Sequence, residues 1–200
     1  MKLAGILGAS GLTKLTTTVF MIGAAVTTAT LGGTSAIFTD NDSIGSNSFT
    51  TGSVDITASP ASAVFNVPAM APGDTQTAPI AVTNTGTLQL RYAVTSTSSE
   101  DILAAQLDMT VKSGVAVCDT ASFDSSGTVL YGPGDSGSTT SINLIGDPAQ
   151  GADSGDRVLS ATASENLCIQ IELPASTTEA FQGTSTTLVF DFESEQTSSN

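Results

Sequence analysis

The chain has 200 residues, with 19 acidic residues against 5 basic ones, no histidine, no tryptophan and a formal net charge of -14 at pH 7. So acidic a chain is a poor partner for nucleic acid or an anionic lipid surface, because both are bound through Lys and Arg. The lack of histidine excludes H-E-x-x-H zinc catalysis and a Ser-His-Asp triad, and a hydrophobic content of 40% indicates a folded chain.

The first predicted element is an apolar segment at residues 15–36. It follows Lys2 and Lys14 and precedes the first acidic residue, Asp40. Positive charge, then apolar residues, then small residues is the order of a secretory signal peptide. A retained membrane anchor is the alternative, but threonines interrupt the segment, and a spanning helix needs about 20 mostly apolar residues.

The expected processing site follows from the small residues at the end of this segment. Thr34 and Ala36 are the small side chains that a signal peptidase requires at the third-last and last positions, so we expect cleavage between Ala36 and Ile37. Residues 1–36 are then a signal peptide and residues 37–200 a single secreted domain. The chain would meet a signal peptidase during export and touch the membrane only through the uncleaved signal.

Beyond this site, short runs with alternating apolar and polar residues predict strands. They cover residues 49–57, 63–67, 78–83, 88–95, 107–117, 128–131, 141–145, 167–173 and 188–193. Pro72 and Gly73 suit the two central positions of a type II turn, and residues 84–87 carry a hairpin signal. Residues 99–107 form the one convincing helical stretch, with a serine cap and acidic residues in its first turn.

About nine strands and one helix predict an all-β fold, a two-sheet sandwich of jelly-roll or Greek-key type with one short helix, preceded by an N-terminal signal helix. Cys118 and Cys168 are the two cysteines of an exported chain, so we expect them to form a disulfide. Cys168 alternates with the apolar residues of its strand. The disulfide should therefore hold the outer surface of a sheet, or an end loop, instead of crossing the core.

The sequence offers weak catalytic signatures. Residues 134–137, Gly-Asp-Ser-Gly, match the serine-nucleophile signature of trypsin-like proteases, but there is no histidine to take the proton, and nothing near Lys112 suggests a Ser-Lys pair. The longer stretch at residues 132–137 fits G-x-G-x-x-G by spacing, although Pro133 and Asp135 oppose the helix that a phosphate site needs. We interpret it as a Gly-rich loop between strands, and we predict no catalytic or cofactor-binding residue.

Carboxylates offer two further possibilities. Residues 40–43, and Asp147 with Asp153 and Asp156, carry hard oxygen ligands suited to calcium, but neither group follows an EF-hand pattern. Solvated loops are the expectation for both, and we assign no metal ligand. A carboxylate pair for glycoside hydrolysis stays open, although nothing in the sequence singles out two residues.

Several blocks of this sequence resemble, in order, the TasA and camelysin family of secreted matrix proteins, which are exported with a dedicated signal peptidase. The blocks are the processing joint at 31–40, the strand at 49–56, the turn at 72–74 with the hairpin at 82–88, the helix at 99–107 and the closing strand at 187–192. The resemblance implies a jelly-roll subunit of extracellular, biofilm-type fibres, in which the freed N-terminal segment of one subunit adds a strand to the next. This chain departs from the lysine-rich members in being shorter, poor in lysine and equipped with the cysteine pair.

Carried onto this sequence, the resemblance places Ile37 and Phe38 at the end of the donor strand. Residues 37–49 carry Ile37, Phe38, Ile44 and Phe49 among polar residues, which is a plausible strand to insert along an open sheet edge. Head-to-tail addition does not close on itself, so it builds filaments of the chain with itself. We therefore expect a protein of the extracellular matrix or cell surface.

Two other functions remain possible on the sequence alone. One is a camelysin-like cell-surface metallopeptidase, since part of the resembled family carries that label; the missing histidines oppose it. The other is a surface adhesion or binding module that does not polymerise. Such a module would share the strands and turns but would not need residues 37–49.

Overall fold

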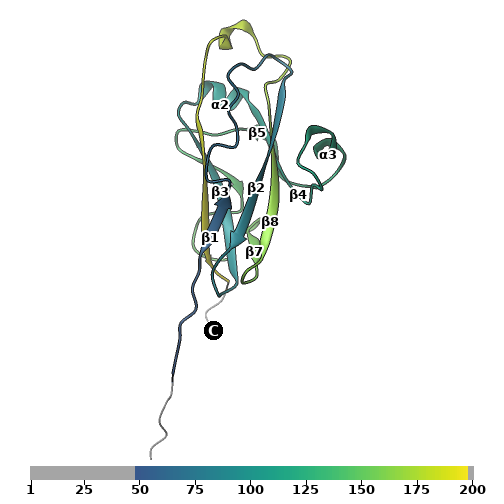
Figure 1. The fold of residues 1–200 in the computed structure, drawn as a ribbon. Helices are drawn as coiled ribbons and strands as arrows, with labels where there is room; N and C mark the ends of the chain where they lie inside the picture. The colour runs from purple at the N-terminus through teal and green to yellow at the C-terminus, as the bar shows by residue number, and fades with distance from the viewer. Residues whose placement is uncertain (1–47, 198–200) are drawn as a thin grey trace, which may run out of the picture. The chain divides into compact units, whose positions relative to one another are not determined.

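The computed structural model describes residues 48–197 (Figure 1). The predicted signal peptide and the predicted cleavage site between Ala36 and Ile37 lie outside the described residues, as do Phe38 and Ile44. From Thr50 onward the chain forms one unit, and the fold given below is that of this unit.

Short strands dominate the described part of the chain. The strands are β1 (Ile56–Ser59), β2 (Thr75–Asn84), β3 (Leu90–Ser98), β4 (Asp108–Ser113), β5 (Thr128–Asp135), β6 (Ile142–Ile145), β7 (Arg157–Leu159), β8 (Ser164–Glu172) and β9 (Leu188–Gln196). The helices are α2 (Ile102–Gln106), α3 (Thr120–Ser125) and the 3-10 turn η1 (Glu179–Phe181).

The strands form two antiparallel sheets. A five-stranded sheet has the order β1-β2-β8-β4-β5. In the second, four-stranded sheet, β3 is central: β6 and β7 pair with successive parts of one edge of β3, and β9 pairs with the whole of the other. The predicted all-β two-sheet sandwich is thereby confirmed, and the described residues contain α3 and η1 in addition to the one short helix that the sequence predicted.

The core lies between the two sheets, where alternate residues of each strand point inward. The five-stranded sheet contributes Ile80, Val82, Met109, Val111, Leu167, Ile169 and Ile171, and β3 contributes Leu90, Tyr92 and Val94. Fully burying one such side chain stabilises the fold by about 1.5–3 kcal/mol. The alternation in β2 and β8 therefore determines which face of the five-stranded sheet is turned inward.

The connection at residues 84–87 differs from the prediction. It joins β2 to β3, which lie in different sheets, so the predicted hairpin is wrong. The local turn chemistry is as expected, because the side-chain Oδ1 of Asn84 accepts a hydrogen bond from the Gly86 N–H at 2.9 Å. However, β1 and β8 already flank this end of β2, which leaves no edge for β3.

The predicted helix is shorter than expected and is capped differently. It begins at Ile102, and the Glu100 carboxylate accepts hydrogen bonds from the N–H groups of Ile102, Leu103 and Ala104. The predicted serine cap is wrong, because the Ser99 hydroxyl instead accepts a hydrogen bond from the Thr187 N–H. That bond holds the start of β9 beside α2.

Candidate functional site

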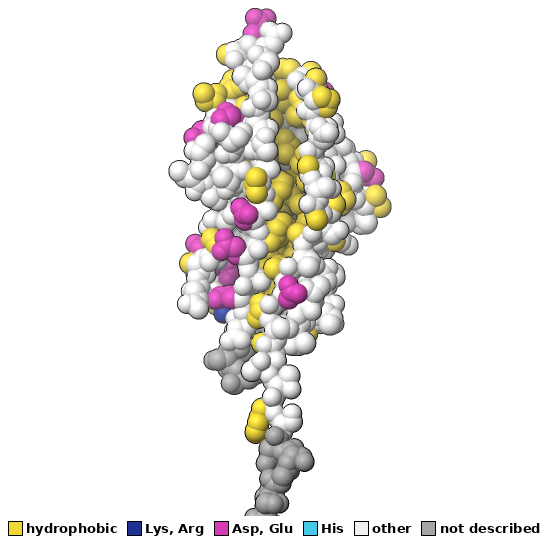
Figure 2. Space-filling view, turned by 60° about the vertical axis from the view of Figure 1, so that its left-hand side comes forward, with side chains coloured by type: hydrophobic (Ala, Val, Ile, Leu, Met, Phe, Trp, Pro, Cys, Tyr) yellow, Lys and Arg dark blue, Asp and Glu magenta, His cyan; other side chains and the backbone are white. Residues whose placement is uncertain are grey.

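A long apolar groove is the main feature of one face of this unit. Figure 2 shows it as a continuous stripe of hydrophobic side chains that runs between two ridges of mostly polar atoms. The groove has a volume of about 1220 Å³. It is lined by the connection between β1 and β2, by β2, α2 and the end of β8, and by residues 177–192.

Two incompletely paired strand edges border the groove. On one side, β1 covers β2 only from Ala81 to Asn84, which leaves the stretch Thr75–Ile80 without a strand partner on that side. On the other side, β9 pairs with β3 alone among the described strands. A strand edge without a partner presents free N–H and C=O groups. The groove is thus open both to apolar side chains and to backbone hydrogen bonds.

The floor of the groove is the exposed flank of the core. Ile80 and Ile171 belong to the core cluster, and Leu103 of α2 packs against it; all three line the groove. On β9, Phe190 and Phe192 point toward the core but stay only half-buried, as the alternating burial of this strand shows. One more strand paired with the free edge of β9 would cover the side chains of Phe190 and Phe192.

Residues 60–70, which we call the strap, lie across this groove. The predicted strand at residues 63–67 is wrong, because the strap forms no strand, and no backbone hydrogen bond joins it to another residue within 48–197. Nevertheless Val64, Phe65 and Met70 are half-buried and pack against the core. Apolar composition alone suggested a strand here; Pro60 and Pro68, which have no N–H to donate, were the signal against it.

Of the predicted donor-strand residues, Phe49 alone lies within the described range. Its side chain is 95% exposed, which is unusual for a large apolar residue. Ile37, Phe38 and Ile44 lie outside the described residues. Sequence reasoning thus identified a candidate donor but not the groove, since the groove is made by segments that lie far apart in the chain.

The serine-nucleophile signature is not a catalytic site in this fold. Ser136 is fully buried, and both its N–H and its hydroxyl donate to the Ala104 carbonyl, at 3.0 and 2.9 Å. The Ser136 carbonyl in turn accepts a hydrogen bond from the Ser96 hydroxyl at 2.6 Å. Ser136 therefore ties α2 to the two sheets. Residues 132–135 of the predicted Gly-rich loop are not a loop, because β5 continues to Asp135.

The carboxylates considered for calcium bind backbone groups. Asp156 accepts hydrogen bonds from the N–H groups of Asp147 and Asp153, at 3.1 and 3.0 Å, and Asp147 accepts one from Ala149 at 2.9 Å. These bonds organise the loop between β6 and β7. The other candidate group, residues 40–43, lies outside the described residues.

A further acidic residue holds α2 and the loop after β5 together. Asp101 accepts hydrogen bonds from the Thr139 N–H at 2.7 Å, the Thr139 hydroxyl at 2.8 Å and the Ser138 hydroxyl at 3.1 Å. These bonds, the Thr139 N–H foremost, favour the charged form and lower the pKa of Asp101. The tie between α2 and this loop is therefore retained into the acidic range below the ordinary aspartate pKa.

The basic side chains of the described region are all used within the fold. Arg91 pairs with Glu195 at 2.7 Å, Arg157 forms a salt bridge with Glu165, and the Lys112 ammonium donates to the Phe123 carbonyl at 2.6 Å. Glu165 also accepts a hydrogen bond from the buried Tyr92 hydroxyl at 2.8 Å. Burial, followed by this hydrogen bond and the charge of Glu165, strongly raises the pKa of Tyr92. The acidic residues far outnumber these cations.

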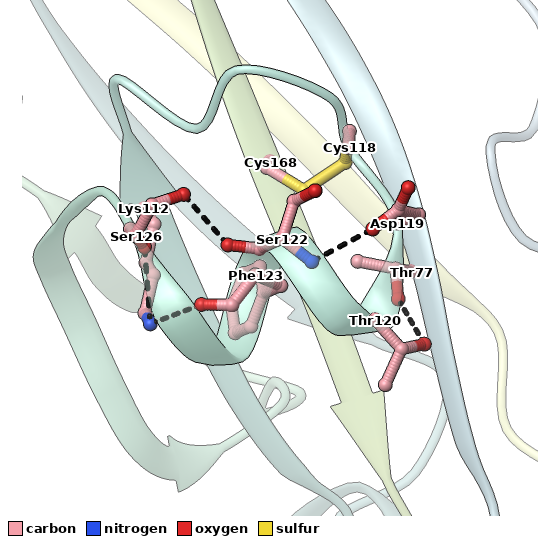
Figure 3. Close-up of a disulfide and its surroundings, with 9 residues drawn as sticks. All are labelled: Thr77, Lys112, Cys118, Asp119, Thr120, Ser122, Phe123, Ser126 and Cys168. Atoms are coloured by element: carbon pink, nitrogen blue, oxygen red, sulfur yellow. Dashed lines mark hydrogen bonds between the residues drawn. A yellow bond between two sulfur atoms is a disulfide. The ribbon is translucent and has the colours of Figure 1, made fainter.

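Cys118 and Cys168 form the predicted disulfide, with their Cα atoms 5.5 Å apart (Figure 3). Cys168 lies in β8 between Leu167 and Ile169, which point into the core, so the disulfide lies on the outer face of the five-stranded sheet. It anchors the loop that carries α3 to that face. The structure thereby places the disulfide where the alternation in this strand predicted it.

The short helix α3, which the sequence analysis missed, is fastened to the same face by further contacts (Figure 3). The Asp119 side chain caps it by accepting from the Ser122 N–H at 2.7 Å, and Thr120 and Thr77 share a hydrogen bond of 3.1 Å. The Lys112 ammonium lies 4.5 Å from the centre of the buried Phe123 ring. An aspartate followed by a short Ser- and Thr-rich stretch was the only signal for this helix.

Comparison with known proteins gives one family. The sequence model of the family described as camelysin metallo-endopeptidase matches residues 13–114, about half of the chain. No curated protein matches the chain. Among solved structures, the ASH/PapD-like domain 7 of human CEP192 is similar over 82% of this chain and 99% of that domain, at 14% identity and a TM-score of 0.29. No conclusion about function follows from so distant a likeness.

The name of the matched family implies a catalytic metal, which the residues of this chain do not fit. The sequence has no histidine, and both of its cysteines are in the disulfide. Within residues 48–197, no three His, Cys, Asp or Glu side chains come together in a way that could hold a metal ion. A catalytic zinc needs three protein ligands, usually including histidine, and the described part of the chain does not bring such a set together. Within the same residues, no helix is long and apolar enough to cross a membrane.

Proposed function

This chain belongs to the family described as camelysin metallo-endopeptidase, and we propose that it is a secreted structural subunit of extracellular fibres. In this proposal, residues 37–49 of one copy enter the groove of the next. The groove carries this proposal. It exposes the flank of the core between two strand edges, and an added strand satisfies both the apolar side chains and the free backbone groups.

The dimensions of the donor segment suit this role. The strand edge offered by β9 is nine residues long, and residues 37–49 are sufficient to pair along all of it. Successive side chains of a strand alternate between its two faces, so Phe38 and Ile44 share one face of the donor, whereas Ile37 and Phe49 share the other. One of these pairs is expected to enter the groove.

A second copy is a better source of the donor than the same chain. Residues 53–55 are bonded to the turn at 85–88, which lies beyond the Asn84 end of β2. The open stretch of β2, Thr75–Ile80, lies on the other side of β1 from that turn. To fill its own groove, the preceding segment would have to turn back past β1, whereas the segment of another copy has no such constraint. Transfer from copy to copy generates filaments.

Electron microscopy of the purified protein beginning at Ile37, at rising concentration, tests the proposal. We expect filaments, and we expect none from a version that lacks residues 37–49. The double variants Phe38→Ser with Ile44→Ser, and Ile37→Ser with Phe49→Ser, form a matched pair that differs only in the face of the strand. Loss of filaments in one double variant and not in the other identifies the face of the donor strand that enters the groove.

The same experiment addresses the alternatives. Dispersed monomers from both the intact and the truncated protein would contradict the fibre subunit and favour a surface adhesion module. If both proteins stay monomeric and the version without residues 37–49 melts at a lower temperature than the intact protein, the segment fills the groove of its own chain. A peptidase is disfavoured because the sequence has no histidine and because no three potential metal ligands come together among the described residues; proteolytic activity in a purified, zinc-loaded sample would overturn that view.

A further inference from the structure

The strap, residues 60–70, forms one wall of the groove and lies on the side where a strand added to the open edge of β2 would have to lie. Val64, Phe65 and Met70 line the groove and pack against the core, and the strap follows β1 directly, along the side where β2 is unpaired. Apolar contact, and not backbone pairing, holds it there, since it forms no backbone hydrogen bond with other residues in the described range.

We propose that the strap is a displaceable plug, which covers the open edge of β2 in the free subunit and leaves it when the donor strand of another copy enters the groove. This inference rests on the proposed function. The exchange favours the donor because a strand brings backbone hydrogen bonds to the free edge of β2 as well as apolar side chains, whereas the strap brings side chains alone. The plug also limits the exposure of core residues before assembly.

The strap sequence explains why it can yield. Pro60 and Pro68 lack an N–H group and disfavour continuous pairing with β2. Pro60 follows directly on the last residue of β1, Ser59. The strap is thereby kept from extending β1 into a full edge strand, and the edge of β2 stays available to a partner.

A single tryptophan can report on the strap, because the chain contains none. In the Phe65→Trp variant of the protein beginning at Ile37, we expect a red shift of the emission and greater quenching by iodide as filaments form. Tyr131→Trp, on β5 at the far edge of the five-stranded sheet, is the matched control and should keep its emission. Filaments that form from the Phe65→Trp protein without a red shift would overturn the plug while leaving the fibre proposal intact.

If no filaments form, the fibre proposal fails, and the plug is tested separately by adding a synthetic peptide of residues 37–49 to the Phe65→Trp protein. A red shift on peptide binding would support displacement, and an unchanged emission would overturn it.

In a filament-forming protein, Phe65→Ser should shorten the lag before assembly severalfold, because it weakens the plug. Val129→Ser, at an exposed apolar residue of β5, should leave the lag unchanged, and an unchanged or longer lag in Phe65→Ser contradicts the plug.

Discussion

At the scale of single residues, Asn84 shows how one buried side chain joins the two sheets. Its Nδ2 group lies within hydrogen-bonding distance of the carbonyls of Leu88, Leu159 and Ser160, at 2.8 to 3.1 Å, while its Oδ1 accepts from Gly86. Asn84 is itself fully buried, so no water can replace these contacts without rearrangement. The turn after β2 and the end of β7 are therefore held by a single amide.

Replacement of this amide is expected to destabilise the fold. Asn84→Ala leaves buried carbonyl groups without a partner, and each such group costs about 1–3 kcal/mol. We expect the free energy of unfolding, measured by urea denaturation, to fall by about 3 kcal/mol. Asn143→Ala, at an exposed position of β6, is the control and should change it little. Equal stabilities of the two variants would show that the Asn84 contacts do not hold the sheets.

At the scale of elements, the loop that carries α3 depends on the disulfide. It covers the outer face of the five-stranded sheet, whereas the groove exposes the inner face of that sheet at the edge formed by β2. The disulfide joins two cysteines that are 50 positions apart in the sequence, and it closes the loop between them. In the chain-entropy view, such a loop contributes about 4 kcal/mol to the stability of the fold.

Removal of the disulfide should therefore lower stability without changing assembly. For Cys118→Ser with Cys168→Ser, we expect the free energy of unfolding to fall by about 4 kcal/mol, measured by denaturation in urea. Filaments should still form at temperatures where the variant is folded. Val117→Ser, an exposed neighbour, controls for a change in this loop. Loss of filaments from a folded disulfide variant would place α3, and not only the groove, in the subunit contact.

At the scale of the whole molecule, charge opposes self-association. Cleavage after Ala36 would remove two of the five basic residues and none of the 19 acidic ones. The three basic residues that would remain are those that bond within the fold. Copies brought together in the proposed filament would therefore repel one another, and apolar burial in the groove would have to exceed this repulsion.

Salt should then promote assembly. Screening shortens the range of charge repulsion from about 10 Å at 0.1 M salt to about 3 Å at 1 M. We expect the lowest protein concentration that gives filaments, measured by sedimentation, to fall as sodium chloride rises over this range. Sucrose at matched osmolality controls for effects other than charge. Filaments that dissolve at high salt would mean that ion pairs, and not the apolar groove, join the subunits.

The sequence by itself determined which residues face inward and where most strands lie, because both follow from local alternation. It predicted that Cys118 and Cys168 would pair, and it placed the disulfide correctly through the parity of β8. It also predicted the type II turn, where the Asp74 N–H donates to the Ala71 carbonyl at 2.9 Å and Gly73 takes a positive φ. These features depend on neighbours in the chain.

Only the tertiary structure decided which strands pair and what lies between them. The turn at 84–87 has hairpin chemistry, yet it crosses between sheets because β1 and β8 flank β2 at that end. Residues 63–67 have the composition of a strand, yet they belong to an unpaired strap over an apolar groove. Pairing depends on which edges distant segments leave free, and local periodicity carries no information about that. The candidate donor is therefore visible in the sequence, whereas the groove proposed to accept it is visible only in the fold.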